Sequence, residues 1–271
     1  MIAVEFVNDP VQWNPRDYAA SSSSQARWGA ELIARLNLCG HEHLLDVGCG
    51  DGKLTVELTH AVPQGRVIGL DRSPDMISYA RQTYPPGTHP NLEFVQMDAR
   101  EIRLPDTYDI VFSNAALHWV DDHQAFLKGT AAVLRPGGKL VVSCGGRGNA
   151  VEVFRAVRTV MRTAPWRAFF RSLRKPYFFY GPEDYQQWLP AAGFRPVAVQ
   201  LVPKDAVHSS VADFTSWFRT TWMPYTHRVP ETHREEFIAA VTQRYLETHP
   251  PDNDGTVYVH MVRLELEAIR V

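Results

Sequence analysis

Short apolar runs alternate with helix-forming segments along the first half of the chain. The runs have the length of strands, and they lie near residues 43–47, 66–70, 92–96, 108–113 and 139–144. This alternation is typical of a parallel β-sheet covered by helices on both faces. Ligands bind such sheets at the carboxyl ends of the strands. We therefore expect an α/β fold with a binding site at that edge of the sheet.

The second half of the chain is mostly helix-forming, and strand patterns return only twice. Segments near 195–203 and 257–269 have the pattern of strands, and they enclose a helical insertion at about 211–248. This order predicts a strand hairpin at the end of the sheet, split by a helical cap. The expected divisions are a flap and helix at 1–40, a core at 41–146, part of the cap at 147–192, a core strand at 193–204, a cap insertion at 205–254 and a final core strand at 255–271.

The segment before the first strand combines aromatic residues with a run of serines. Trp13 and Tyr18 precede the serines at 21–24, and an amphipathic helix with Trp28 and Leu32 on its apolar face follows. A free linker would not carry this much aromatic area. We interpret the segment as an ordered flap over the ligand.

A glycine-rich turn follows the first predicted strand, at residues 44–52. Its three glycines form G-x-G-x-G, whereas the dinucleotide fingerprint G-x-G-x-x-G needs its last glycine where this chain has Lys53. A phosphate-binding P-loop also fails, because Val47 stands where its first glycine should be. The turn lets the backbone pass close to a ligand without Cβ interference, and Asp46 can meet an ammonium group. The pattern therefore favours an amino acid joined to a nucleoside.

These residues resemble the first motif of the class I S-adenosylmethionine-dependent methyltransferases. Four further segments resemble the second to fifth strands of that family, in order, at residues 67–71, 94–99, 108–114 and 134–142. The resemblance implies a Rossmann-like, seven-stranded sheet that is mostly parallel, with a C-terminal antiparallel strand and a helical cap. It also implies that the core at 41–146 binds S-adenosylmethionine as its cofactor.

The resemblance also implies roles for residues at the strand ends. Asp71 would accept the two ribose hydroxyls, Asp98 would accept the adenine amino group, and the Ala99 N–H would meet a ring nitrogen. A charged acceptor contributes about 1.5–3 kcal/mol per hydrogen bond. The expected cofactor-binding residues are Asp46, Gly48, Gly50, Asp71, Arg72, Met76, Asp98, Ala99 and Asn114.

Residues 114–119, Asn-Ala-Ala-Leu-His-Trp, follow the fourth strand and should line the acceptor side of the site. Family members that methylate amino groups of nucleobases often carry Asn-Pro-Pro-aromatic here, so the two alanines disfavour base methylation. His118 is the catalytic candidate. It could accept a proton, orient a carboxylate, or simply be hydrogen-bonded within its loop. The expected substrate residues are Trp13, Tyr18, Gln25, His118, Trp119 and Arg147.

The wider resemblance is to the trans-aconitate methyltransferase group, and it extends from residues 13–18 to the region near Phe237. It implies carboxyl O-methylation of a small organic acid. The serine run and His118, where glutamine is usual in that group, leave the acceptor open. The alternatives are methylation of carbon, nitrogen or a hydroxyl of a specialised metabolite, and a cofactor-binding protein without turnover, since a fold does not fix chemistry.

One stretch of the predicted cap is strongly basic. It contains no acid, and aromatic residues are interleaved with its cations, which are Arg155, Arg158, Arg162, Arg167, Arg171, Arg174 and Lys175. The stretch could face an anionic, partly apolar acceptor, or it could be a solvated helix face. A nucleic-acid groove is disfavoured because aromatic RNA-recognition motifs are absent.

The composition describes an ordinary globular chain. Of its 271 residues, 45% are hydrophobic and 21% charged, which is enough for a substantial core. A formal net charge of −2 gives no general attraction to nucleic acid or to an anionic membrane. No signal-peptide or membrane-spanning pattern is present, so we expect a cytoplasmic protein without membrane or nucleic-acid partners. The three cysteines lack metal-ligand spacing, so we expect neither a disulfide framework nor a metal site.

Overall fold

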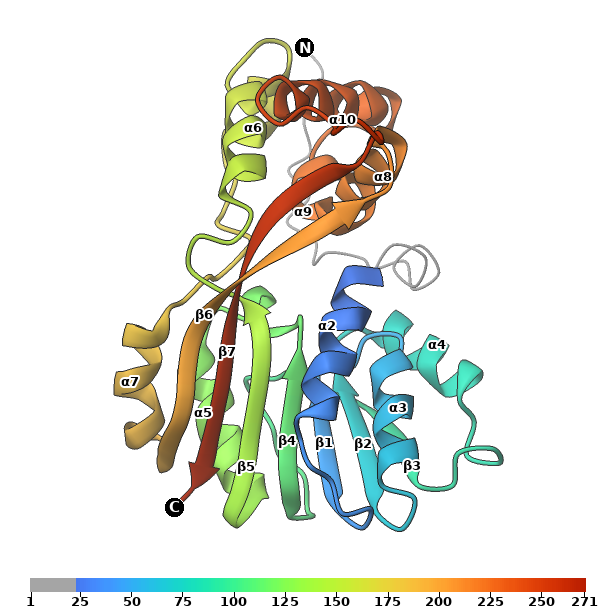
Figure 1. Cartoon of the computed structure of the whole chain (residues 1–271), viewed down its shortest axis with the longest axis vertical. Coiled ribbons are helices and arrows are strands. Elements are labelled where there is room, and N and C mark those ends of the chain that lie inside the picture. The colour runs from blue at the N-terminus through green and yellow to red at the C-terminus, as the bar shows by residue number, and fades with distance from the viewer. Residues whose placement is uncertain (1–22) are drawn as a thin grey trace.

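The described part of the chain, residues 23–271, contains seven strands in one sheet, in the order β3-β2-β1-β4-β5-β7-β6 (Figure 1). In this computed structural model the neighbours among β1 to β5 are parallel, whereas β7 is antiparallel to both β5 and β6. The predicted mostly parallel sheet with a C-terminal antiparallel strand is confirmed. The strands are His43–Val47 (β1), Arg66–Asp71 (β2), Leu92–Gln96 (β3), Tyr108–Asn114 (β4), Leu134–Gly145 (β5), Phe194–His208 (β6) and Val257–Arg270 (β7).

Helices cover both faces of the sheet. One face packs against α2 (Ser23–Ala34), α3 (Lys53–Ala61) and α4 (Pro74–Thr83). The other packs against α5 (His123–Val133) and α7 (Pro182–Ala191). Each helix turns an apolar stripe toward the strands, and this burial is the main source of stability for such helices. No helix between residues 23 and 271 is both long and apolar enough to cross a bilayer.

The predicted cap range 147–192 is too long, because α7 belongs to the sheet layer. Its Tyr185 and Leu189 are fully buried among side chains of the sheet. The Tyr185 hydroxyl also forms a hydrogen bond of 2.6 Å with Nδ1 of His123 in α5. A helical pattern reveals that a segment has an apolar face, but it does not reveal which surface covers that face.

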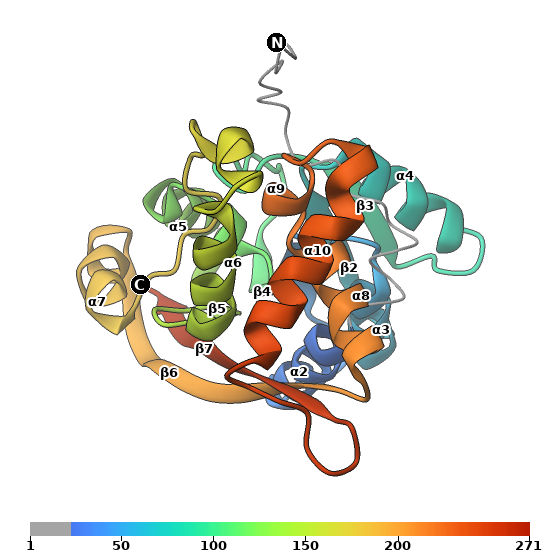
Figure 2. The same cartoon turned by 90° about the horizontal axis from the view of Figure 1, so that it is seen from above.

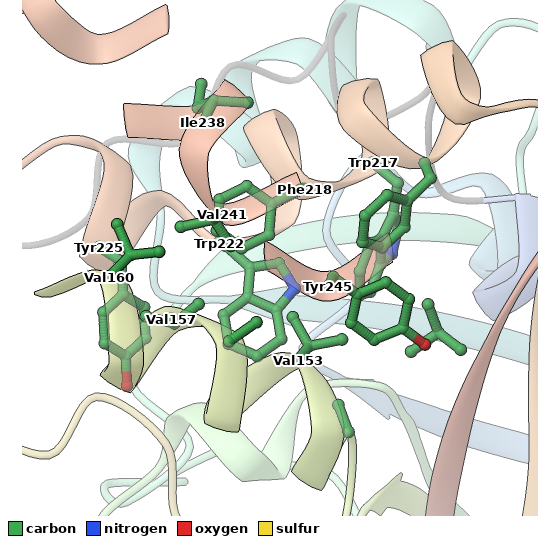
Figure 3. Packing of buried hydrophobic residues seen from close by; sticks show 14 of the residues in the cluster. Val153, Val157, Val160, Trp217, Phe218, Trp222, Tyr225, Ile238, Val241 and Tyr245 are labelled. Atoms are coloured by element: carbon green, nitrogen blue, oxygen red, sulfur yellow. The ribbon is translucent and has the colours of Figure 1, made fainter. Parts of the chain in front are cut away.

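A helical cap stands over the carboxyl ends of the parallel strands (Figures 1 and 2). Its buried side chains form a core separate from those of the sheet. Figure 3 shows side chains of α6, α8 and α10 meeting in this core. The cap elements are α6 (Val151–Met161), the 3-10 helix η2 (Trp166–Phe170), α8 (Val211–Thr221), α9 (Met223–Thr226) and α10 (Glu231–Leu246).

The hairpin of β6 and β7 connects the cap to the sheet. β6 continues to His208, beyond the predicted end at 204, and it pairs there with Val257 of β7. This upper part of the hairpin extends past β5, and Ala206 and Met261 pack into the cap core. Burial against the cap is therefore the reason that the strand is longer than its sequence pattern suggested.

Candidate functional site

A cavity of about 280 Å³ opens at the carboxyl ends of the parallel strands. Its walls come from the turn after β1, the ends of β2 and β3, the loop after β4 and a segment returning from the cap. They comprise Gly48, Gly50, Leu70, Asp71, Arg72, Met76, Met97, Asp98, Ala99, Arg100, Ala115, Ala116, Trp119, Val120, Asp121 and Phe178. The fold therefore brings five separate segments to the edge where a site was expected.

The glycine turn after β1 forms one wall of this cavity. Gly48 has φ of 78° and donates its N–H to the Leu70 carbonyl at 2.6 Å. Gly50 has φ of 55° and donates its N–H to Oδ2 of Asp71 at 3.0 Å. A Cβ added at Gly48 would overlap the Cβ of Ala116 in the loop after β4. Both the backbone angle and this close approach require glycine at position 48.

Asp71 ends β2 with its carboxylate held by two backbone donors. Oδ1 accepts the Ser73 N–H at 2.8 Å, and Oδ2 accepts the Gly50 N–H at 3.0 Å. Burial raises the pKa of this carboxyl, and the two hydrogen bonds oppose that rise. Each oxygen retains a further acceptor position. The side chain could therefore take a pair of hydroxyl donors from a ligand in the cavity.

Asp98 and Arg100 form an ion pair at the rim. Arg100 donates its backbone N–H to Oδ1 of Asp98 at 2.9 Å and its Nη2 to Oδ2 at 2.8 Å. The Arg100 guanidinium holds the pKa of Asp98 below its usual range. Asp98 is thus an ionised acceptor, and the neighbouring Ala99 lines the cavity beside it.

A smaller cavity of about 70 Å³ adjoins the first, and we call it the acceptor cavity because His118 and Trp119, which were predicted to face a methyl acceptor, line it. Ala115 and Trp119 line both cavities. The walls of the acceptor cavity are largely aromatic: the rings of Trp119 and Tyr177 lie 4.6 Å apart, as do those of Phe154 and Trp222. A pocket of this kind excludes water and suits the apolar body of a small ligand.

His118, in the 3-10 helix η1 (Leu117–Trp119), lines the acceptor cavity. Its Nδ1 accepts the Gly145 N–H at 3.2 Å. Because a backbone N–H can only donate, this hydrogen bond assigns the ring proton to Nε2. Burial, together with the nearby charge of Arg263, lowers the pKa of the imidazole to about 3. The ring is therefore neutral at physiological pH, with Nε2–H as its remaining polar group.

Arg263 brings a positive charge to the acceptor cavity from β7. The residue is only 2% exposed. Its Nη2 donates to the Ser143 carbonyl at 2.6 Å and to Oδ1 of Asn114 at 3.1 Å, and its Nε donates to Oγ of Ser143 at 3.2 Å. A guanidinium remains charged even at this depth. The cavity wall is consequently better suited to an anion than to a cation.

The sequence model described as "Methyltransferase domain" matches residues 45–142. An uncharacterized methyltransferase of Schizosaccharomyces pombe is 32% identical over 94% of this chain and 97% of its own length. This chain belongs to the methyltransferase family. A trans-aconitate 2-methyltransferase of Methylobacterium radiotolerans is 31% identical over 90% of this chain and 92% of its own. The solved magnesium protoporphyrin IX methyltransferase of Synechocystis PCC 6803 shares the fold, with a TM-score of 0.55 and 16% identity over 94% of this chain and 86% of that one.

The methyl donor of this methyltransferase is S-adenosylmethionine, and the solved structure from Synechocystis, which shares the fold, holds the corresponding product, S-adenosylhomocysteine. The first cavity, at the carboxyl ends of the parallel strands, fits such a ligand. Its glycine turn lies so close to the loop after β4 that a Cβ at Gly48 would overlap Ala116, so the backbone itself forms this part of the wall. Asp71 and Asp98 place carboxylates in its lining, which suits a ligand rich in hydroxyl and amino donors.

The predicted cofactor residues divide into two groups in the methyltransferase. Asp46 and Asn114 are buried and do not belong to the lining of the first cavity. Asp46 accepts a hydrogen bond from Oγ1 of Thr55 at 2.7 Å, and burial raises its pKa to about 7. The direct cofactor contact of these two side chains stays a prediction. The seven that do line the cavity are Gly48, Gly50, Asp71, Arg72, Met76, Asp98 and Ala99.

The predicted acceptor residues are only partly described by the structure. Trp119 and His118 line the acceptor cavity. Trp13 and Tyr18 lie outside the described residues, and so does the side chain of Gln25, whose backbone belongs to α2.

Arg147 does not line either cavity. Its side chain is 52% exposed, and its guanidinium pairs with Asp184 at 2.8 Å and Glu183 at 3.2 Å, at the start of α7. The loop after β5 turns this side chain toward the acids of α7. The prediction that Arg147 meets the acceptor is therefore not supported.

Arg263 was missed in the sequence, although it carried a signal. Val257, Val259 and Met261 alternate with polar residues and are buried, and Arg263 continues that series. A charge at an inward position of a buried strand marks a functional candidate. Phe178, which lines the first cavity, carried no such signal, because its place depends on how the chain returns from the cap.

Proposed function

We propose that this methyltransferase transfers a methyl group to a carboxylate oxygen of a small organic acid. The observation that carries the proposal is the protonation state of His118: its Nδ1 is engaged by Gly145, and its pKa is about 3. A neutral imidazole with its proton on Nε2 is a hydrogen-bond donor rather than a base. A carboxylate is already ionised at neutral pH and needs no base, whereas a hydroxyl acceptor usually needs one.

The acceptor cavity has the groups that a carboxylate requires. In the proposal, the Nε2–H of His118 donates to one carboxylate oxygen, and Arg263 supplies the compensating positive charge. The aromatic walls formed by Trp119, Tyr177 and Phe154 hold the apolar body and exclude water. S-Adenosylmethionine supplies an electrophilic methyl group on a sulfonium, so the protein mainly has to orient the acceptor. Such orientation lowers a barrier by about 7–11 kcal/mol.

The cofactor contacts form the second part of the proposal. Asp71 accepts the ribose hydroxyls, Asp98 accepts the adenine amino group, and the Ala99 N–H meets the adenine ring. The turn at Gly48 and Gly50 brings the backbone close to the amino-acid end. The similarity to trans-aconitate 2-methyltransferases supports an acid as the acceptor class.

Replacing Asp71 with alanine should weaken S-adenosylmethionine binding by roughly tenfold or more, because a charged hydrogen-bond acceptor contributes about 1.5–3 kcal/mol. Isothermal titration calorimetry measures the change directly. Asp75→Ala is the matched control, since Asp75 is an exposed acid in the first turn of α4. An unchanged affinity in folded Asp71→Ala protein would remove the ribose contact from the proposal.

The acceptor class is tested by measuring S-adenosylhomocysteine formation with a panel of free organic acids and with the methyl ester and amide of each. We expect product only from the free acids. At saturating cofactor, turnover should not fall between about pH 8 and 6, because the pKa of His118 lies near 3 and the ring stays neutral throughout. Loss of turnover with an apparent pKa near 6.5, or product from the esters and amides, would contradict carboxyl methylation.

A further inference from the structure

A third cavity, more open than the other two, lies beside α6 and has a volume of about 650 Å³. It shares a wall with the acceptor cavity, because Asn149, Phe154, Tyr177 and Phe179 line both. We call it the basic groove, after the cations in its lining, which are Arg158, Arg162, Arg174 and Lys175.

The cations of the basic groove face no acid in its lining. None of the four forms an ion pair within residues 23–271, and the sequence between 153 and 182 contains no acid. Nε of Arg158 donates to the Phe154 carbonyl at 3.2 Å, and the Lys175 ammonium lies 5.4 Å from the Phe178 ring. Like charges gathered in a concavity repel one another and focus a positive potential. The groove is therefore suited to an anion.

One stripe of α6 connects the two cavities. Phe154 and Arg158 of α6 and Arg162, which caps the helix at its C-terminus in a helical conformation, follow one another at intervals of four residues, so they lie on the same side. The stripe covers about 12 Å, at roughly 1.5 Å per residue. It leads from the aromatic wall of the acceptor cavity to the cations of the basic groove. A ligand that contacts both ends must be elongated, and its middle must be apolar.

We infer that the acceptor is an elongated acid that carries a second anionic group at the far end of an apolar chain, and that this group binds in the basic groove. The inference rests on the proposed carboxyl methylation. The reacting carboxylate lies beside His118, the chain crosses Phe154 and Tyr177, and the second anion meets Arg158 and Arg162. That anion is a carboxylate or a phosphate, since a guanidinium pairs with both. A compact acid would leave the basic groove unused.

Dicarboxylic acids with terminal carboxylates and increasing chain length provide the first test. Each is compared with the monocarboxylic acid of the same length and with that acid bearing a terminal phosphate. We expect one chain length at which a doubly anionic acid exceeds the monocarboxylate in kcat/KM by roughly tenfold or more, through KM. The series with the higher kcat/KM, dicarboxylic acids or acids with a terminal phosphate, shows whether the second anion is a carboxylate or a phosphate. Equal kcat/KM values in all matched sets would overturn the inference.

Charge reversal in the basic groove provides the second test. Arg162→Glu should raise KM for the doubly anionic acid by roughly tenfold or more, with kcat and the monocarboxylate kinetics unchanged. Arg155→Glu is the matched control, because Arg155 is exposed on the same helix and outside the groove lining. It should change neither acid's kinetics. Wild-type KM values for the doubly anionic acid in Arg162→Glu would reject the basic groove as its binding site.

Calorimetric titration separates this inference from the proposed function, because it requires no turnover. The doubly anionic acid is titrated into the enzyme in the presence of S-adenosylhomocysteine. Binding that Arg162→Glu abolishes, without methyl transfer to any acid, would support the basic groove and reject carboxyl methylation. The opposite outcome is methyl transfer to free acids at a rate that is the same with or without a second anion and the same in Arg162→Glu. It would retain carboxyl methylation and reject the basic groove as a binding site.

Discussion

Gly48→Val should abolish measurable S-adenosylmethionine binding, with an affinity loss of roughly hundredfold or more. Gly48 has φ of 78°, a region that costs an L-residue about 1–2 kcal/mol and is least accessible to β-branched side chains. The added side chain would also overlap Ala116, which lines the first cavity, where we propose that the cofactor binds. The loop after β4 must then move away, and the cavity wall is lost. The valine side chain therefore acts by displacing the loop after β4, whether or not it also touches the cofactor.

Gly137→Val is the matched control for this substitution. Gly137 has φ of 80°, but a Cβ there meets nothing within 4 Å. It should therefore lose stability through backbone strain alone and retain cofactor affinity. Calorimetric binding and thermal unfolding are measured for both variants. A folded Gly48→Val protein that binds S-adenosylmethionine within about threefold of the wild-type affinity would show that the turn tolerates a side chain, against the steric argument.

Arg263→Met should lower the free energy of unfolding by about 2–5 kcal/mol and reduce kcat/KM for the acid by roughly hundredfold or more. The substitution removes donors from the Ser143 carbonyl and from Oδ1 of Asn114, both of which are buried. It also removes the positive charge from the acceptor cavity. Chemical denaturation and steady-state kinetics measure the two effects.

Arg263→Lys separates the structural effect from the functional one. Lysine keeps the charge but lacks the planar fork that reaches Ser143 and Asn114 together. We expect a folded enzyme with S-adenosylmethionine affinity close to wild type and kcat/KM for the acid reduced by roughly tenfold. Wild-type kinetics in Arg263→Lys, combined with full activity of any folded Arg263→Met protein, would exclude Arg263 from acceptor recognition.

Local patterns in the sequence determined the sheet and most of the first cavity, where we propose that the cofactor binds. The strand runs, the glycine turn at Gly48 and Gly50, and the acids Asp71 and Asp98 each lie within one strand and the loop that follows it. Parallel strands end at the same edge, so these separate signals converge without further information. The structure confirms the sheet and brings these four residues to one cavity. The reason is that each signal depends on contacts only a few residues apart in the chain.

Only the tertiary structure decided which residues line the acceptor cavity and what they contact, because those contacts join residues far apart in the chain. Nδ1 of His118 is engaged by Gly145, and Asn114 binds Arg263, which is 149 positions later. Arg147 had the residue type expected for an acid-binding group, but the fold pairs it with acids of α7. The basic run of the cap could have been a solvated face, and the way that α6 packs places part of it around a groove. Hydrophobic periodicity identifies which face of an element is apolar, whereas the topology decides what that face and its polar neighbours meet.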